Sequence, residues 1–87
     1  MIRLQQAVIV EGKYDKIKLS NLLDTLILTT DGFGIFKDKE KLAFLRRIAE
    51  TRGLIVLTDS DSAGFLIRNF LQSSIPPQYL THVYVPD

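Results

Sequence analysis

The 87-residue sequence contains no cysteine and no tryptophan, and its only histidine is His82. The absence of cysteine excludes disulfide bridges, thiolate metal sites and a thiol nucleophile. Without a second histidine or a cysteine as co-ligand, a surface or core role for His82 is favoured over metal binding. Any chemistry must therefore depend on carboxylates, hydroxyls, amines or the single His82.

Long apolar runs are also missing. No segment approaches the roughly 18 residues of a membrane span, and the N-terminus lacks the basic flank, apolar stretch and cleavage site of a signal peptide. We therefore expect a cytoplasmic protein. Hydrophobic residues make up 46% and charged residues 24%, which is typical of a globular chain. The length is too small for two cores, so we expect a single domain over residues 1–87.

Short β-branched runs alternate with stretches of helical periodicity. Strands are predicted at residues 7–10, 25–30, 54–57 and 81–85. Helices are predicted at residues 14–23, between the N-cap Asp38 and the stop at Gly53, and at residues 65–72. Strands joined by helical crossovers run parallel. The predicted fold class is α/β, a three-layer α/β/α arrangement with a four-stranded parallel sheet and helices on both faces.

Acidic residues follow the predicted strands. Parallel strands end at one edge of the sheet, and Glu11-Gly12, Asp31-Gly32 and Asp59-Ser60-Asp61 all fall there. Three clustered carboxylates repel one another unless a cation neutralises them. Mg²⁺ prefers oxygen ligands and serves phosphoryl transfer. Alternatively, Asp, Ser and Gly at strand-to-helix junctions cap helices and make turns, although neither role requires Glu11.

Two segments resemble the signature motifs of the Toprim domain family. The first is Val-Ile-Val-Glu-Gly at residues 8–12, followed by Asp15, and the second is Val-Leu-Thr-Asp-Ser-Asp-Ser-Ala-Gly at residues 56–64. The resemblance implies a Rossmann-like fold. It also implies that Glu11 is the general acid or base and that Asp59 and Asp61 bind Mg²⁺, with all three acids contributing to the catalytic metal site.

Within that family the chain is most similar to the N-terminal domain of ribonuclease M5 enzymes and their short relatives, through Glu11-Gly12-Lys13 and Thr30-Asp31-Gly32. This similarity implies a Mg²⁺-dependent endoribonuclease that matures the 5S ribosomal RNA precursor together with ribosomal protein L18. Two features depart from the pattern. The turn at residues 59–64 is nearer to the primase form, and the 87 residues cover one Toprim domain and not the second domain that the resemblance to a full ribonuclease M5 leads us to expect.

Basic and aromatic residues complete the candidate set. If a nucleic acid crosses the acidic edge, we expect contacts from Lys13 beside Glu11, from Lys37 and Arg68 as flanking cations, and from the Asp31-Gly32 turn. The helix-borne rings of Phe44, Phe65 and Phe70 are predicted to lie in the core. RNA is favoured over DNA as the partner.

Two other functions remain open. The first is a non-catalytic Toprim module that binds nucleic acid, as in recombination mediators. The second is a phosphate-accepting receiver domain, which also places acids at strand ends. A receiver domain would carry an acid pair after its first strand, whereas here that strand ends in a single Glu11 before Gly12.

Overall fold

A computed structural model describes residues 1–85, apart from the side chains of Phe33 and Val85. The strands are β1 (Ile2–Arg3), β2 (Ala7–Val10), β3 (Leu23–Asp24), β4 (Ile27–Thr29), β5 (Leu54–Asp59) and β6 (Leu80–Val85). The helices are α1 (Lys13–Ser20), α2 (Lys39–Arg52) and α3 (Ser62–Ser74), with two 3-10 helices, η1 (Gly32–Lys37) and η2 (Pro77–Tyr79).

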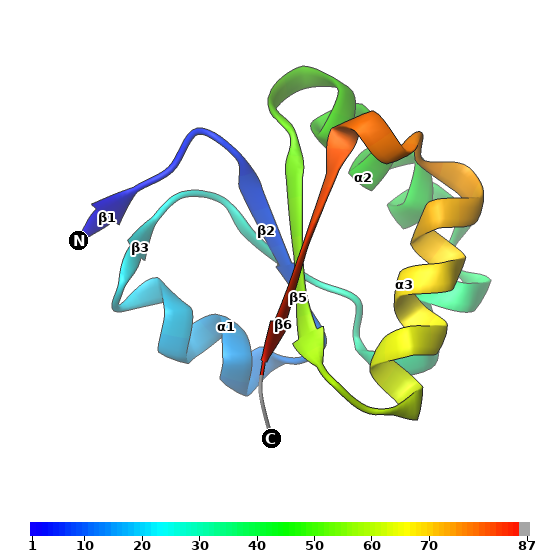
Figure 1. The fold of residues 1–87 in the computed structure, drawn as a ribbon, viewed down its shortest axis with the longest axis horizontal. Helices are drawn as coiled ribbons and strands as arrows, with labels where there is room; N and C mark the ends of the chain where they lie inside the picture. The colour runs from blue at the N-terminus through cyan, green and yellow to red at the C-terminus, as the bar shows by residue number, and fades with distance from the viewer. Residues whose placement is uncertain (86–87) are drawn as a thin grey trace.

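The main sheet has the order β4-β2-β5-β6, and every neighbouring pair is parallel. Helix α1 lies against one face, and α2 and α3 lie against the other (Figure 1). The predicted three-layer α/β fold with a four-stranded parallel sheet is confirmed. Because β2 and β5 are the two central strands, the residues that follow them come together in the middle of one edge.

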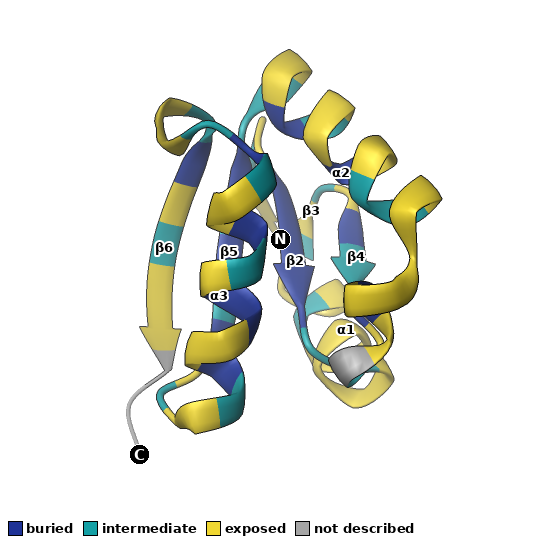
Figure 2. Cartoon of the chain, turned by 90° about the vertical axis from the view of Figure 1, so that its right-hand side faces the viewer, coloured by how far each residue is buried: buried dark blue, intermediate teal, exposed yellow. Residues whose placement is uncertain are grey.

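The core divides between the two faces because successive strand residues point to opposite sides. On the α2 and α3 side, Ile9 and Val56 are fully buried together with Leu45 and Leu71. Figure 2 shows this buried material lining the inner sides of α3 and the sheet. On the other side a smaller cluster packs against α1, which contributes no buried residue of its own. The sheet face around α1 is therefore only partly covered.

Element boundaries differ from the predicted ones mainly around α1. The helix ends at Ser20 rather than at residue 23, because Leu23 and Asp24 form β3 and pair in parallel with β1. Two-residue strands are too short to carry a periodic signal, so this second sheet was not predicted. After the expected turn at Asp31-Gly32 the chain forms η1, and α3 begins three residues earlier than expected, at Ser62.

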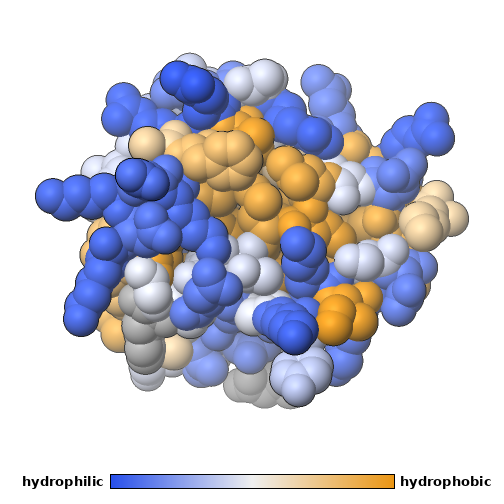
Figure 3. All heavy atoms as spheres, turned by 180° about the vertical axis from the view of Figure 1, so that it is seen from behind, coloured by the Kyte–Doolittle hydropathy of each residue, from blue (hydrophilic) through white to orange (hydrophobic). Residues whose placement is uncertain are grey.

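Several large apolar side chains are exposed. The prediction that Phe44 and Phe65 lie in the core is wrong, since they are 49% and 46% exposed. On the side where β4 forms the edge of the sheet, apolar side chains gather in an area surrounded by hydrophilic ones (Figure 3). Over residues 1–85, none of the helices has both the length and the apolar character needed to cross a bilayer.

Candidate metal and catalytic site

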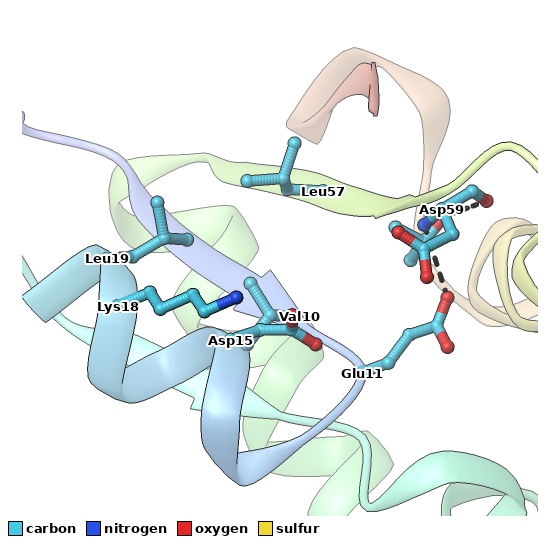
Figure 4. Close-up of a pocket in the computed structure, with 8 residues that line it drawn as sticks. Val10, Glu11, Asp15, Lys18, Leu19, Leu57 and Asp59 are labelled. Carbon is cyan, nitrogen blue, oxygen red and sulfur yellow. Dashed lines mark hydrogen bonds between the residues drawn. The ribbon is translucent and has the colours of Figure 1, made fainter. Parts of the chain in front are cut away.

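Glu11 and Asp59 meet at the centre of the carboxyl edge. They follow or end the adjacent strands β2 and β5, whose register pairs Ile9 with Val56. The Glu11 carboxylate accepts a hydrogen bond from the backbone N–H of Asp59 at 3.3 Å, and Figure 4 shows the two residues turned toward each other. The parallel pairing therefore brings together two of the three acids that the sequence predicted.

The backbone of Glu11 is held by the turn after β4. Its carbonyl oxygen accepts hydrogen bonds from the Thr30 hydroxyl at 3.2 Å and from the Gly32 N–H at 3.1 Å. Thr30 is buried. Asp31, between these two donors, adopts a left-handed conformation with φ of 57°, which Asp tolerates better than most residues. The turn thus positions Glu11 through its main chain and leaves the carboxylate exposed to the edge.

The electrostatic surroundings of Glu11 favour its protonated form. Partial burial raises the pKa of the Glu11 carboxyl above its ordinary value, and the hydrogen bond from Asp59 opposes that rise. The negative charges of Asp59, Asp61 and Asp15 raise the pKa of Glu11 further. A carboxyl group with a raised pKa holds its proton to higher pH than an ordinary glutamate, which suits it to accept and return a proton. A bound cation would reverse the effect of the neighbouring charges.

Asp61, the third predicted acid, caps a helix in this structure. Its carboxylate caps α3 by accepting a hydrogen bond from the Gly64 N–H at 2.7 Å. The capping role that the sequence left open is therefore present at Asp61, together with its proximity to Glu11. Gly64 itself lies tightly against the end of β5, where a Cβ atom would be 2.2 Å from the Asp59 carbonyl oxygen.

The two roles of Asp61 can be separated by substitution. We expect Asp61→Ala to destabilise the protein by about 1 kcal/mol through loss of the cap, whereas Asp61→Asn keeps a good capping residue and changes stability little. Both variants should weaken Mg²⁺ binding if the carboxylate is a ligand. Thermal unfolding and Mg²⁺ titration measure the two effects.

The matched control is Asp38→Ala, which removes the cap of α2, where Asp38 accepts a hydrogen bond from the Lys41 N–H at 2.9 Å. It should cost similar stability without changing Mg²⁺ binding. Equal Mg²⁺ affinity in Asp61→Asn and the unmodified protein would contradict a ligand role for Asp61.

The donor set fits a hard divalent cation held by few protein ligands. Over the described residues, no three acidic or histidine side chains converge closely enough to hold a metal by themselves. Glu11 and Asp59 share the edge, while the nearby Asp61 is engaged in its cap. Mg²⁺ typically retains several waters and binds through one or two carboxylates plus substrate phosphate. The arrangement matches that mode better than a closed structural site.

Asp15 is a further acid that the sequence interpretation did not assign to the site. It lies in the first turn of α1 and its charge acts on Glu11. Together they line a cleft of about 320 Å³, bounded also by Val10, Lys18, Leu19, Leu57, Thr58 and Asp59 (Figure 4). The available signal was the position of Asp15 in the first turn of a helix that begins two residues after Glu11.

The predicted nucleic-acid contacts have different surroundings. Lys13 at the start of α1 and Lys37 at the end of η1 are exposed near the acidic edge. Gly32 directs its N–H to Glu11. The Asp31 side chain is held by Lys41 at 2.7 Å and by the Thr29 hydroxyl at 2.9 Å. Asp31 therefore stabilises the turn, and its pKa is lowered by these same two partners.

Arg68 requires a correction. It was expected to meet a phosphate, but it is only 2% exposed. Its guanidinium donates to the carbonyl oxygens of Val56, Thr58 and Val83 and to Nδ1 of His82. These bonds fasten β6 to β5 beneath α3. The sequence led us to expect an exposed Arg68, because the pattern of apolar residues in α3 does not show which of its faces β6 covers.

Comparison with known proteins agrees with this geometry. A family profile described as the Toprim domain matches residues 6–85. The chain is 32% identical over 83 residues to ribonuclease M5 of Mycoplasma genitalium, covering 95% of this chain and 43% of that protein. It is 31% identical over 86 residues to ribonuclease M5 of Lactiplantibacillus plantarum, covering 99% and 44%. The chain thus spans less than half the length of these relatives.

A solved structure is also similar. The small TOPRIM domain protein from Bacillus stearothermophilus superposes with a TM-score of 0.77 at 29% identity, covering 98% of this chain and 72% of that one. The profile match covers nearly the whole sequence, and the fold agrees with it through the parallel sheet and the carboxylates at the ends of its two central strands. The chain therefore belongs to the Toprim domain family.

Proposed function

We propose that this chain is a Mg²⁺-dependent Toprim nuclease domain that acts on structured RNA, in the manner of ribonuclease M5 maturation of the 5S ribosomal RNA precursor. The observation that carries the proposal is the pairing of Glu11 with Asp59 at the ends of the central strands, in surroundings that raise the pKa of Glu11. The similarity to ribonuclease M5 over most of the chain supports RNA as the substrate.

The chemistry requires charge neutralisation and proton transfer. A bound divalent ion supplies Lewis-acid stabilisation of the phosphate oxygens. Asp59 would hold that ion, with Glu11 or Asp61 as a second ligand. Glu11 would hold or release the proton at its carboxylate during attack and departure, because its pKa is raised in the free protein. Thr30 and Gly32 keep the Glu11 backbone in place.

Exposed cations can guide the polyanion to this edge. Lys13 begins α1 directly after the Glu11-Gly12 pair, and Lys37 ends η1 on the other side of the turn that holds Glu11. Both are exposed. Cations that contact phosphates add salt-dependent affinity without reading sequence. They would therefore orient the RNA, while specificity comes from other contacts or from ribosomal protein L18.

The direct test incubates the chain with 5S precursor RNA, with and without Mg²⁺ and with and without ribosomal protein L18. We expect product only with Mg²⁺, and more of it with L18 present. Chelation by EDTA should stop the reaction, and added Mg²⁺ should restore it. Cleavage that is unchanged in EDTA would overturn the proposed mechanism.

A second function is a Toprim module that binds nucleic acid without cleaving it. It is favoured by the capping role of Asp61, which engages one of the three predicted acids in a hydrogen bond within the chain. This function predicts salt-dependent RNA or DNA binding with no product on long incubation. Mg²⁺-dependent product in the same experiment would exclude it.

A further inference from the structure

Two half-exposed aromatic rings lie beside the acidic edge on its α3 side. Tyr84 and Phe65 are 52% and 46% exposed, and their ring centroids are 6.2 Å apart with planes inclined by 53°. Tyr84 on β6 pairs in register with Thr58, the residue before Asp59. Phe65, in the first turn of α3, donates its N–H to the Asp61 carbonyl oxygen at 3.0 Å. The two rings thus adjoin the segment that carries both aspartates.

The Tyr84 ring is held in place by contacts with Arg68 and His82. The guanidinium carbon of the buried Arg68 lies 3.9 Å from its ring centroid, and the His82 ring stacks at 6.5 Å with an interplanar angle of 24°. Arg68 is anchored by backbone carbonyls, so it cannot follow a ligand. One face of the Tyr84 ring is occupied by this cation, and half of the residue still reaches solvent. A ring held in this way loses little conformational entropy when a second flat group stacks on it.

The charges nearby restrict which ligand can use these rings. Asp59 and Asp61 disfavour an anionic group in direct contact with the platform, whereas a neutral flat ring is not repelled. Unpaired bases in RNA are recognised mainly by stacking on aromatic side chains, and such stacking tolerates any base. A nucleotide combines a neutral base that can stack with a phosphate linkage that can extend toward the acidic edge.

We propose that Tyr84 and Phe65 form a stacking platform for an unpaired RNA base next to the phosphate that a metal ion bound at Glu11 and Asp59 would hold. This inference rests on the proposed function in taking RNA as the ligand. It adds that the substrate must present an unstacked nucleotide beside the cleaved bond. The platform is the pair of rings, and Arg68 is the positioning residue beneath it.

The test measures binding of a short fluorescent single-stranded RNA by anisotropy, in EDTA so that no Mg²⁺-dependent cleavage occurs. Stacking on one aromatic residue contributes enough that its loss weakens binding by about 5- to 100-fold. We expect a loss in that range for Tyr84→Ala and for Phe65→Ala. Tyr84→Phe keeps the ring and should bind within about twofold of the unmodified protein. The same RNA annealed to its complement should bind more weakly to the unmodified protein.

Phe44→Ala is the matched control. Phe44 is a helix-borne phenylalanine with 49% exposure, close to the value for Phe65, but it lies on α2. Its loss should leave RNA binding unchanged. Circular dichroism melting of each variant shows whether it is folded at the assay temperature. If Tyr84→Ala unfolds, Phe65→Ala decides the result, because it leaves the contact between Arg68 and Tyr84 in place.

The outcomes separate this inference from the proposed function. Unchanged RNA binding by folded Tyr84→Ala and Phe65→Ala overturns the platform. If both variants also lose stability without losing RNA affinity, the two rings serve contacts within the protein and not RNA binding. Normal cleavage by the same variants would overturn the platform and leave the nuclease function standing. Stacking-dependent binding without cleavage of any RNA would support the platform and remove the nuclease function.

Discussion

Glu11→Gln is expected to lower the rate of RNA cleavage by about 10²- to 10⁴-fold at saturating Mg²⁺, the range for losing one positioned acid or base. Glutamine has nearly the same shape and can still accept the hydrogen bond from the Asp59 N–H, which is 3.3 Å from the Glu11 carboxylate. The fold should therefore survive, and only the charge and the titrating proton are removed. Single-turnover cleavage of a 5S precursor RNA measures the effect.

Glu50→Gln is the control for that substitution. Glu50 lies on α2 and pairs with Arg46 at 3.3 Å, with both side chains largely exposed. The same chemical change there should leave cleavage unaltered and alter stability by less than about 1 kcal/mol. Cleavage by Glu11→Gln at the rate of the unmodified protein would contradict the role given to Glu11.

The raised pKa of Glu11 adds a pH dependence with a defined sign. Folding raises this pKa above its unfolded value, so the folded state binds the proton more tightly. The stabilisation is complete below the unfolded pKa and is lost as pH rises through the folded one. In metal-free buffer at neutral pH, Glu11→Gln should therefore melt at a higher temperature than the unmodified protein.

Added Mg²⁺ should reverse that order. A ligand that binds only the folded state stabilises it by about 1.4 kcal/mol at a tenfold excess over its dissociation constant. The unmodified protein should gain this stability, and Glu11→Gln should gain less. If Mg²⁺ raised the melting temperature of both proteins equally, Glu11 would neither bind the ion nor lie close to it.

Gly64→Ala is expected to have the largest effect on stability. A Cβ atom at residue 64 would lie 2.2 Å from the Asp59 carbonyl oxygen and 2.9 Å from the Thr58 hydroxyl. Neither atom can yield easily, since one is backbone and Thr58 is buried. Overpacking of this severity costs about 3 kcal/mol, the upper end of the usual range. For a domain of this size that loss lowers the melting temperature by about 15 °C.

The control for Gly64→Ala is Gly34→Ala in η1. A Cβ atom there would be 3.6 Å from the Asp31 Cβ, which is ordinary van der Waals contact. We expect a change within about 1 kcal/mol, which thermal melting followed by circular dichroism resolves. A melting temperature for Gly64→Ala within a few degrees of the unmodified protein would mean that α3 can move away from β5.

Sequence alone was enough to predict the parallel sheet and to place Glu11 and Asp59 at one edge of it, and the reasons are local. The runs at residues 7–10 and 54–57 are too short and too β-branched for helices, and helical crossovers make their strands parallel. Glu11 and Asp59 then had to share an edge. The pairing of β1 with β3 was not predictable, because two residues such as Ile2 and Arg3 show no periodicity.

The errors in the site arose where several elements converge. Arg68 has the same sequence signature whether its helix face meets solvent or β6, and only the position of Thr58 and Val83 beside it decides. Phe65 looked like a core residue for the same reason. The choice of Asp61 between helix cap and metal ligand depends on whether the Gly64 N–H reaches its carboxylate, which spacing cannot show.

The strand order places the acidic residues on central strands and other residues near the site on edge strands, and the two kinds of strand differ in how easily their hydrogen bonds open. Glu11 and Asp59 are attached to β2 and β5, each of which has a hydrogen-bonded neighbour on both sides. The turn after β4 and Tyr84 on β6 belong to edge strands, which fray at lower free energy than central ones. Amide hydrogen exchange should therefore be slowest in the central strands β2 and β5 and faster in the edge strands β4 and β6. Under the proposed function, sequence changes at the two edge strands alter which RNA is accepted and leave the central carboxylate pair intact.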